Sequence, residues 1–348
     1  MPSGHARLSR RRLGRTNLQV TIAGFGGIPI QIVPEEVAIA AVRRAYDLGV
    51  NFFDTARGYT NSEERIGKAL AGRDCLIATK SGSREADAIH RDVNRSLASL
   101  DCDRIDLYQL HGVNNDDELA SVLAPGGALD GLRRAREEGK IAHIGISGHR
   151  RETLVRAVQT CPDFATVQVP FNLVEDEALD ALIPLCHGRD VGVIAMKPCG
   201  GGNFANPPLA LKWCLTQPIS VAIPGMANPQ EVEEDVAAAF DPFLTEEDTL
   251  AIERMRTDLD QRTCRRCRYC EPCPQGVHIS SLLHGRSVVK RMGAARWREW
   301  GALEMIASAD LCTECGECLR KCPYHLPIPE LIREVVAYLR TIPELTEG

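Results

Sequence analysis

The sequence predicts an α/β protein: a (β/α)8 barrel followed by a small, mainly helical domain rich in cysteine. Three observations lead to this prediction. Short apolar runs alternate with longer amphipathic ones in eight successive pairs between residues 20 and 240, which is typical of parallel strands joined by crossover helices. The alternation stops after Phe240. Eight of the 14 cysteines then lie within residues 264–322.

Each strand–helix pair follows the previous one after a short loop. An open doubly wound sheet would also alternate, but the count of eight pairs and the lack of a G-x-G-x-x-G motif after the first strand favour the barrel. The helix that begins at Ser62 is expected to use that serine as its N-cap. The predicted strands are 21–27, 51–56, 75–82, 105–112, 141–148, 164–172, 192–198 and 220–226, and the predicted helical segments are 34–49, 62–70, 86–100, 118–139 in two pieces, 151–160, 175–186, 207–217 and 228–240.

The residues after the eighth pair predict a second domain. We expect a boundary near residue 243, which divides the chain into a barrel at 1–243 and a cysteine-rich domain at 244–348. A helix with a capping signal at Thr245 is expected at the start of the second domain. Residues 327–340 predict a helix that closes it.

The composition is that of an ordinary globular protein and excludes several classes. Hydrophobic residues make up 44% of the chain, charged residues 25%, and the net charge is −6, which argues against general nucleic-acid binding. No run approaches the roughly 20 apolar residues of a membrane-spanning helix, and the basic N-terminus lacks the apolar segment of a secretory signal. We therefore expect a cytoplasmic protein, in which clustered cysteines indicate metal rather than disulfides.

Four polar side chains lie at the predicted C-terminal ends of neighbouring strands. Asp54 ends the second strand, Tyr59 follows in its loop, Lys80 ends the third strand and His111 ends the fourth. Active sites of (β/α)8 barrels lie at this end, so we expect the four groups to meet there. Each residue alone also has a structural explanation, such as a loop tyrosine or a core histidine. It is their convergence that predicts a catalytic site.

Together these groups suit proton transfer to a carbonyl oxygen. An ammonium beside a phenol stabilises the phenolate, so we expect Lys80 to lower the pKa of Tyr59, while Asp54 pairs with Lys80. His111 can orient a substrate oxygen through a hydrogen bond. The set predicts carbonyl reduction, in which hydride reaches the carbon while Tyr59 protonates the developing alkoxide.

These segments resemble the aldo/keto reductase family, from LGRTNLQV (13–20) to the end of the eighth pair. The resemblance is strongest in FFDTARGYTNSEERIGKAL, IATK, DLYQLH and GVIAMKPCGGG, where the family's Asp–Tyr–Lys–His tetrad falls on Asp54, Tyr59, Lys80 and His111. It implies a (β/α)8 barrel and NADP(H)-dependent reduction of small carbonyl substrates or oxidation of alcohols. The nicotinamide would lie across the rim of the barrel.

The same resemblance implies where the dinucleotide would bind. Ser147 and Gln168 would contact the nicotinamide amide, and Phe171 would stack on its ring. The remaining candidates line the pyrophosphate and adenosine segments; they are Lys197, Gly200, Gly201, Gly202, Gly225, Asn228, Glu231 and Glu234.

One departure from the family affects the choice of cofactor. Many members place a lysine or arginine after the last strand to hold the 2′-phosphate of NADP. Here no basic residue occurs between Gly225 and Ala239, and four acids stand there instead. An acidic side chain can bind a free ribose hydroxyl, so NAD stays open beside NADP.

The cysteines form two closely spaced runs that end in proline. The first reads C-x2-C-x2-C-x2-C-P, and the second reads C-x2-C-x2-C-x3-C-P, the run of bacterial ferredoxins with [4Fe–4S] clusters. Three close thiolates bind one cluster, and the fourth ligand often comes from the other run. We expect two clusters with crossed ligation: Cys264, Cys267 and Cys270 with Cys322, and Cys312, Cys315 and Cys318 with Cys273.

The segments CRYCEPCPQGV and CGECLRKCP resemble the ferredoxin-like C-terminal domain of one bacterial branch of aldo/keto reductases. The expected fold is therefore a (β/α)8 TIM barrel followed by a small, mainly helical ferredoxin-like iron–sulfur domain. The expected function is that of an NAD(P)H-dependent oxidoreductase whose two clusters act in electron transfer or in structure. The alternatives are a nucleotide-binding redox sensor and a reductase with structural zinc.

Charge is unevenly distributed near the cysteines. Residues 262–298 contain nine lysines and arginines but one acid. Such a segment can dock an acidic electron carrier such as ferredoxin or flavodoxin, or it can dock onto the acidic barrel of the same chain.

Overall fold

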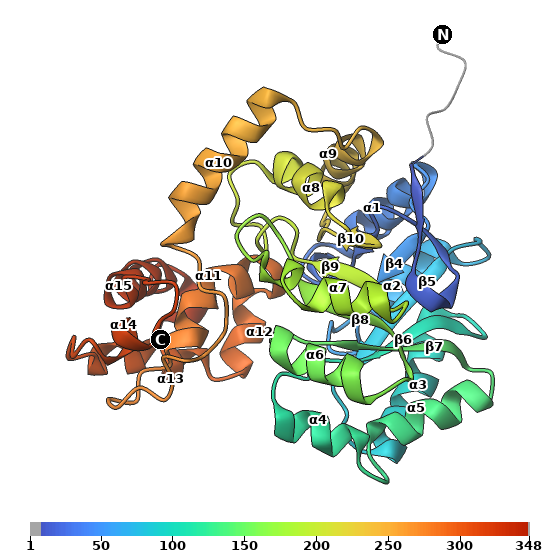
Figure 1. Ribbon diagram of the computed structural model, residues 1–348, viewed down its shortest axis with the longest axis horizontal. Helices are drawn as coiled ribbons and strands as arrows, with labels where there is room; N and C mark the ends of the chain where they lie inside the picture. Colours follow the sequence, from blue (N-terminus) through green and yellow to red (C-terminus); the bar gives the residue numbers. More distant parts are fainter. Residues whose placement is uncertain (1–7, 347–348) are drawn as a thin grey trace.

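Eight parallel strands form a barrel in the larger part of the molecule (Figure 1). The computed structural model describes residues 8–346. Each strand pairs with the next along the chain, and the bridges Ala23–Ala222 and Gly26–Gly225 join the first edge to the last. The barrel is thus nearly closed, which confirms the predicted fold class. The strands are β3 Phe25–Gly26, β4 Phe52–Asp54, β5 Leu76–Ser81, β6 Ile105–Leu110, β7 Ile141–Ser147, β8 Phe164–Pro170, β9 Gly192–Met196 and β10 Val221–Ile223.

An N-terminal hairpin closes the end of the barrel at which the strands begin. Strand β1 (Arg10–Arg12) pairs antiparallel with β2 (Gln19–Thr21). Leu13, between them, is fully buried and lies against Gly192 at the start of β9. Apolar strand residues fill the interior above Leu13, so the opposite rim is the place for a functional site. These interior residues are Phe52, Ala78, Leu107, Ile194 and Val221.

Helices follow the strands and cover the outside of the barrel (Figure 1). Each turns its apolar face inward; on α3, for example, Ile89, Val93 and Leu100 are buried. This burial is what stabilises amphipathic helices of such length in a protein. The helices are α1 Glu35–Asp47, α2 Ser62–Leu70, α3 Ala86–Leu100, α4 Asp116–Leu123, α5 Ala128–Glu137, α6 Arg151–Thr160, α7 Leu182–Gly188, α8 Pro207–Thr216 and α9 Pro229–Phe240.

The predicted cap of α2 is wrong. Asn61 precedes the helix, and Ser62 is its first residue. The Ser62 hydroxyl donates to the carbonyl of Gly27 at 2.8 Å and accepts from the Thr55 hydroxyl at 2.8 Å. Ser62 is fully buried, so its hydroxyl joins the loops after β3 and β4 instead of capping the helix.

Helix α10 (Glu246–Asp260) connects the barrel to the cysteine-rich region. Its capping signal is confirmed, because the Thr245 hydroxyl accepts from the Asp248 N–H in a reciprocal capping box. The side chains of Ile252, Met255 and Leu259 pack with the barrel core. The domain boundary near residue 243 stays a prediction.

The C-terminal helices enclose a second hydrophobic core beside the barrel (Figure 1). Leu282, Trp297 and Leu339 lie at its centre, with Cys270 and Cys322 among its buried members. The last helix falls within the predicted 327–340. These helices are α11 Ile279–Met292, α12 Ala294–Glu299, α13 Ala302–Ala307, α14 Glu317–Lys321 and α15 Ile328–Leu339.

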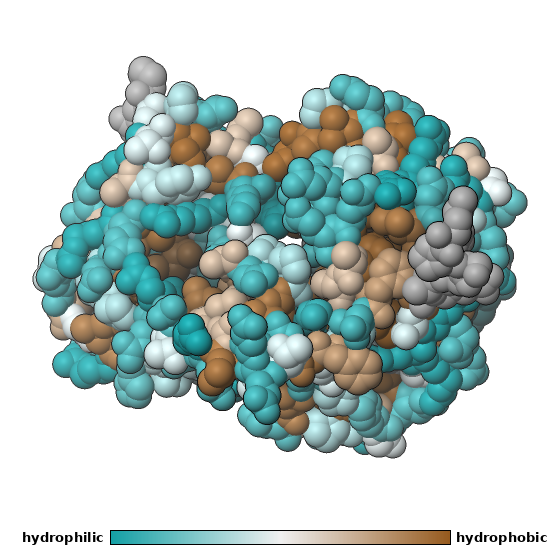
Figure 2. All heavy atoms as spheres, turned by 90° about the horizontal axis from the view of Figure 1, so that it is seen from above, coloured by the Kyte–Doolittle hydropathy of each residue, from teal (hydrophilic) through white to brown (hydrophobic). Residues whose placement is uncertain are grey.

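Polar residues cover much of the face seen in Figure 2, with separate apolar patches between them. Among the helices that the structure describes, none combines the length and the apolar character needed to cross a membrane.

Candidate active site and cysteine sites

A cavity of about 430 Å³ opens at the C-terminal ends of the barrel strands. Asp54, Tyr59 and Gln168 line its barrel end. The cavity then runs along the loops after β9 and β10, and α11 of the cysteine-rich domain forms another part of its wall. The site is therefore built by both parts of the chain.

The structure brings the four residues of the predicted tetrad together at the rim. Lys80 Nζ lies 2.6 Å from Asp54 Oδ1 and donates to the Thr55 carbonyl at 2.7 Å. It is 5.2 Å from the centre of the Tyr59 ring. The His111 ring stands edge-on to Tyr59, with 5.8 Å between ring centres. The chemical roles of these groups stay predictions.

The buried Lys80–Asp54 pair sets the charge at this rim. The side chain of Lys80 is 1% exposed and that of Asp54 is 4% exposed. Burial lowers the pKa of Lys80, but Asp54, Tyr59 and Glu63 together raise it above its usual value, so the amine stays protonated. Asp54 Oδ2 has no hydrogen-bond partner within residues 8–346. Removing either partner would leave an uncompensated charge in the interior.

The pKa of Tyr59 moves in the direction opposite to the expected one. Burial raises the pKa of the phenol and outweighs the lowering effect of Lys80. The phenol is therefore protonated at neutral pH and can serve as a proton donor. For His111, burial, followed by the charges of Lys80 and Arg84, lowers the pKa to about 3, so this imidazole is neutral.

Two glutamines and a serine lie on the barrel strands near the tetrad: Gln109 pairs with Lys80, and Ser147 pairs with Gln168. Gln109 Nε2 donates to Gln168 Oε1 at 2.6 Å, and both side chains are buried. The buried Ser147 hydroxyl accepts from the Gly112 N–H at 3.2 Å. Gln109 was missed in the sequence, although a glutamine inside the apolar strand IDLYQL is a signal that could have found it.

Part of the loop after β9 lines the cavity, while its contact with a pyrophosphate stays a prediction. Lys197, Gly201 and Gly202 line the cavity, and Lys197 Nζ is 2.9 Å from His149 Nε2. Burial, followed by the charge of Arg266, lowers the pKa of Lys197 well below its usual value. Gly200, Gly201 and Gly202 all have positive φ, a backbone conformation that favours glycine.

The other predicted cofactor residues divide into two groups. Gly225, Glu231 and Glu234 line the cavity. Asn228 instead caps α9, because its side chain accepts from the Glu231 N–H. Phe171 is fully buried and stacks on Trp213 with 5.5 Å between ring centres. The structure thus places Phe171 in the core behind the rim, where it supports the barrel wall.

Five polar residues of the cavity wall come from the cysteine-rich domain and were missed in the sequence. They lie in the first cysteine run and on α11, far along the chain from the barrel loops. No local pattern distinguishes them from other basic or polar surface residues. They are Arg266, His284, Ser287, Lys290 and Arg291.

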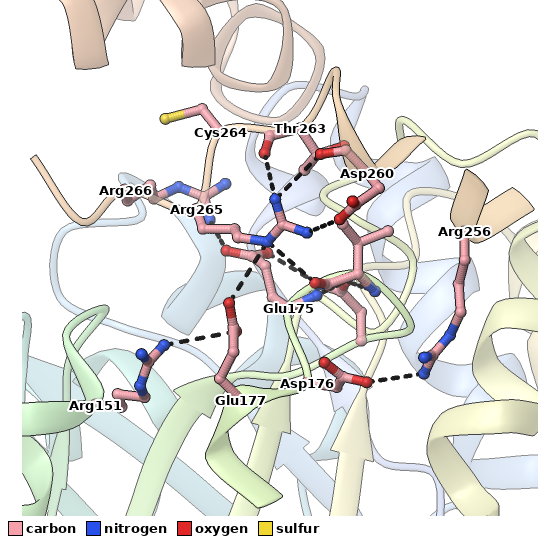
Figure 3. A network of polar contacts seen from close by, with 12 residues as sticks. Arg151, Glu175, Asp176, Glu177, Arg256, Asp260, Thr263, Cys264, Arg265 and Arg266 are labelled. Atoms are coloured by element: carbon pink, nitrogen blue, oxygen red, sulfur yellow. Dashed lines mark hydrogen bonds and ion pairs between the residues drawn. The ribbon is translucent and has the colours of Figure 1, made fainter. Parts of the chain in front are cut away.

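Figure 3 shows how the first cysteine run is attached to the barrel rim. Arg266 NH1 lies 3.0 Å from Glu175 Oε1, and Arg265 Nε lies 3.5 Å from Glu177 Oε1. The side chains of Arg265 and Glu175 are 7% and 8% exposed. The basic segment predicted to dock on a carrier or on the barrel thus makes ion pairs with the barrel of its own chain.

The eight cysteines surround two small enclosed spaces. One is lined by the first three cysteines of the first run together with Cys322. The other is lined by Cys312, Cys315 and Cys318 with Cys273, and Cys270 lies at its edge. Two sets of four thiols in apolar surroundings fit the ligand needs of two clusters. Among residues 8–346, no three histidine, cysteine, aspartate or glutamate side chains lie close enough together to hold a single metal ion.

The barrel rim carries a paired ammonium, a phenol and an imidazole, and two sets of four cysteines lie beside it. This combination is typical of an oxidoreductase. Residues 22–206 match the model of the aldo/keto reductase family, and residues 263–327 match that of a 4Fe-4S dicluster domain. This chain belongs to the aldo/keto reductase family and is an NAD(P)-dependent oxidoreductase with a C-terminal 4Fe-4S dicluster domain.

Three relatives match between 67% and 72% of this chain. The L-galactose dehydrogenase of Arabidopsis thaliana is 30% identical, over 67% of this chain and 88% of its own length. An aldo-keto reductase from Klebsiella pneumoniae, solved in complex with NADPH, is 25% identical with a TM-score of 0.60, over 71% of this chain and 95% of its own. The holo form of AKR11C1 from Bacillus halodurans shares the fold, with a TM-score of 0.63 at 23% identity over 72% of this chain and 96% of its own.

Proposed function

We propose that this protein reduces a small carbonyl compound, or oxidises the matching alcohol, with Tyr59 as the general acid or base. One observation carries the proposal: the Lys80–Asp54 pair, Tyr59 and His111 lie together, and Asp54 and Tyr59 line a cavity that extends to α11. When bound there, NADP(H) supplies or accepts the hydride. NAD(H) is the alternative cofactor.

The residues of the tetrad transfer the proton and orient the substrate. Tyr59, protonated because burial raises its pKa, donates its proton to the developing alkoxide. Lys80 then stabilises the phenolate, and Asp54 keeps Lys80 in place and charged. The neutral imidazole of His111, beside Tyr59, donates a hydrogen bond that orients the substrate oxygen.

The cavity walls support a dinucleotide. Ser147 and Gln168 would hold the nicotinamide amide; this is supported by their pairing between β7 and β8 and by Gln168 lining the cavity with Tyr59. Lys197 and the glycine loop would lie along the pyrophosphate, with Glu231 and Glu234 toward the adenosine. The NADPH complex of the Klebsiella relative supports NADPH as the cofactor.

The two sets of four cysteines would each hold a [4Fe–4S] cluster, with crossed ligation between the runs. The cavities lined by these sets support the crossed pairing. The thiolates would supply all four bonds to each cluster. The clusters would transfer electrons, to an acidic carrier such as ferredoxin or flavodoxin, or stabilise the domain. Reduced thiols of this kind suit a cytoplasmic location.

The test uses protein purified without oxygen, with its iron counted and its cluster absorbance recorded. Replacing Tyr59 by Phe should lower carbonyl reduction about 100-fold or more and leave NADPH binding unchanged. Tyr46→Phe is the matched control and should keep full activity, because Tyr46 is a half-buried residue of α1 that does not line the cavity. Unchanged reduction by the Tyr59→Phe protein, over a panel of aldehydes and ketones, would overturn the proposal. Zinc in place of iron would overturn the cluster assignment.

A further inference from the structure

The adenosine end of the cavity lacks positive charge from the barrel. After β10, the chain contributes Glu231, Glu234 and Asp235 to the cavity wall, with no lysine or arginine before Ala239. A dinucleotide carries negative phosphates, which need cationic groups or N–H donors when they leave water. The loop after β10 therefore provides no cationic side chain for a phosphate at this end.

Helix α11 of the cysteine-rich domain brings two cations to this end. Lys290 and Arg291 lie in its last turn and line the same cavity as Tyr59. Lys290 Nζ donates to the carbonyl of Gly202. Arg291 Nε donates to the Gly201 carbonyl at 3.2 Å, and its NH1 donates to the Gly225 carbonyl at 3.2 Å. The two side chains thus connect the glycine loop with the loop after β10.

Arg291 keeps donors available for a ligand. A guanidinium has five N–H groups, and the two carbonyls use two of them. Glu231 Oε2 lies 3.8 Å from Arg291 NH1, beyond hydrogen-bond distance, and itself accepts from the Ala227 N–H at 2.8 Å. The Arg291 side chain is 16% exposed, so a phosphate there would be partly removed from water and would be bound more strongly.

We propose that the iron–sulfur domain completes the dinucleotide pocket, with Lys290 binding the pyrophosphate and Arg291 binding the ribose 2′-phosphate. This inference rests on the proposed function and makes NADP(H) the preferred cofactor. A planar guanidinium with several free donors matches a phosphate in two-point contact. The appended domain thereby provides the cation that the loop after β10 lacks.

The test measures dissociation constants of NADPH and NADH, by quenching of tryptophan fluorescence, for the anaerobic holoprotein and its variants. Arg291→Gln should weaken NADPH binding by about tenfold or more while changing NADH binding little. Arg291→Lys should lie between it and wild type. Lys290→Gln should weaken both ligands. Arg286→Gln is the matched control on the same helix, because Arg286 stacks on Tyr338 in the C-terminal domain; it should change neither constant.

Three outcomes would overturn the inference. Equal weakening of NADPH and NADH by Arg291→Gln would show that Arg291 does not bind the 2′-phosphate, and so would no weakening at all. If the variant does not fold, wild-type protein gives the answer: 2′,5′-ADP should compete with NADPH more strongly than 5′-ADP, and equal competition overturns the assignment. A wild-type protein that binds no dinucleotide would instead refute the proposed function.

Discussion

The Lys80–Asp54 pair at the barrel rim and the cations Lys290 and Arg291 of α11 lie at the same cavity but are held by different interactions. Lys80 is buried and paired with a carboxylate at 2.6 Å. Lys290 and Arg291 are bonded to neutral backbone carbonyls at the contact between two parts of the chain. The first arrangement holds one charge state in a fixed place. In the second arrangement, N–H donors of the cationic side chains stay free to bind a ligand.

Ion pairs attach the cysteine-rich domain to the barrel. Arg265 and Arg266, in the first cysteine run, bond to Glu177 and Glu175 on the barrel rim (Figure 3). These ion pairs are largely buried, so each partner depends on the other. The position of α11 over the cavity therefore depends on a domain contact, while the position of Lys80 depends only on neighbouring strands. Four experiments test this difference, beginning with the largest expected effect.

Replacing Lys80 by Met should remove carbonyl reduction almost completely and destabilise the barrel. The Asp54 carboxylate would remain buried without its partner, which typically costs about 3–5 kcal/mol of unfolding free energy. Denaturant titration and kcat/KM with NADPH measure the two effects. Lys68→Met is the control, because Lys68 pairs with Glu35 on the surface with both side chains about half exposed, and such pairs contribute about 0–1 kcal/mol. Equal stability of the Lys80→Met protein and wild type would contradict the buried-pair argument.

Cysteine variants should show which thiols share a cluster. A double replacement within one set, Cys273→Ser with Cys318→Ser, should cost about half of the bound iron, because one cluster survives. A double replacement across sets, Cys322→Ser with Cys318→Ser, should remove nearly all of it. Iron analysis and visible absorbance measure both proteins. Cys75→Ser, in the barrel, should keep the wild-type iron content. Equal iron loss in the two double variants would rule out the crossed pairing.

Replacing Arg266 by Gln should loosen the domain contact without removing a tetrad residue. Glu175 would lose its charged partner while remaining 8% exposed, at an expected cost of about 1–3 kcal/mol. Thermal unfolding followed by cluster absorbance should then begin at a lower temperature. Arg340→Gln is the control, since Arg340 pairs with Asp310 at a site where both are exposed, and it should shift the transition little. A transition for Arg266→Gln that matches this control would speak against the contact.

Acid should weaken the fold through His111. Its pKa is lowered from 6.5 to about 3 in the folded protein, first by burial and then by Lys80. Between these pH values the unfolded chain binds a proton that the folded chain does not, so stability falls as pH decreases. The stability advantage of wild type over His111→Asn should therefore shrink between pH 7 and pH 4. A constant or growing advantage, measured by urea titration, would contradict the neutral imidazole.

Local patterns in the sequence were enough to find the barrel, the tetrad and the two cysteine runs. Strand ends in a parallel barrel share one rim, so Asp54, Lys80 and His111 could be placed together from strand order alone. The cysteine runs could also be found in the sequence, because the ligands of an iron–sulfur cluster are closely spaced along the chain. The cap of α2 could not be read in this way, since Ser62 has a buried partner in another loop.

Other features depend on contacts between distant segments, and the tertiary structure decided them. The direction of the Tyr59 pKa shift follows from burial, which outweighs Lys80. Phe171 lies in the core because Trp213 of α8 packs against it. Lys290 and Arg291 reach the cavity because the C-terminal domain docks on the barrel rim. The physical reason is common to all three. The sequence of a segment determines which side chains it carries and how they are spaced. The packing of distant segments determines which of those side chains are buried, paired or close to a ligand.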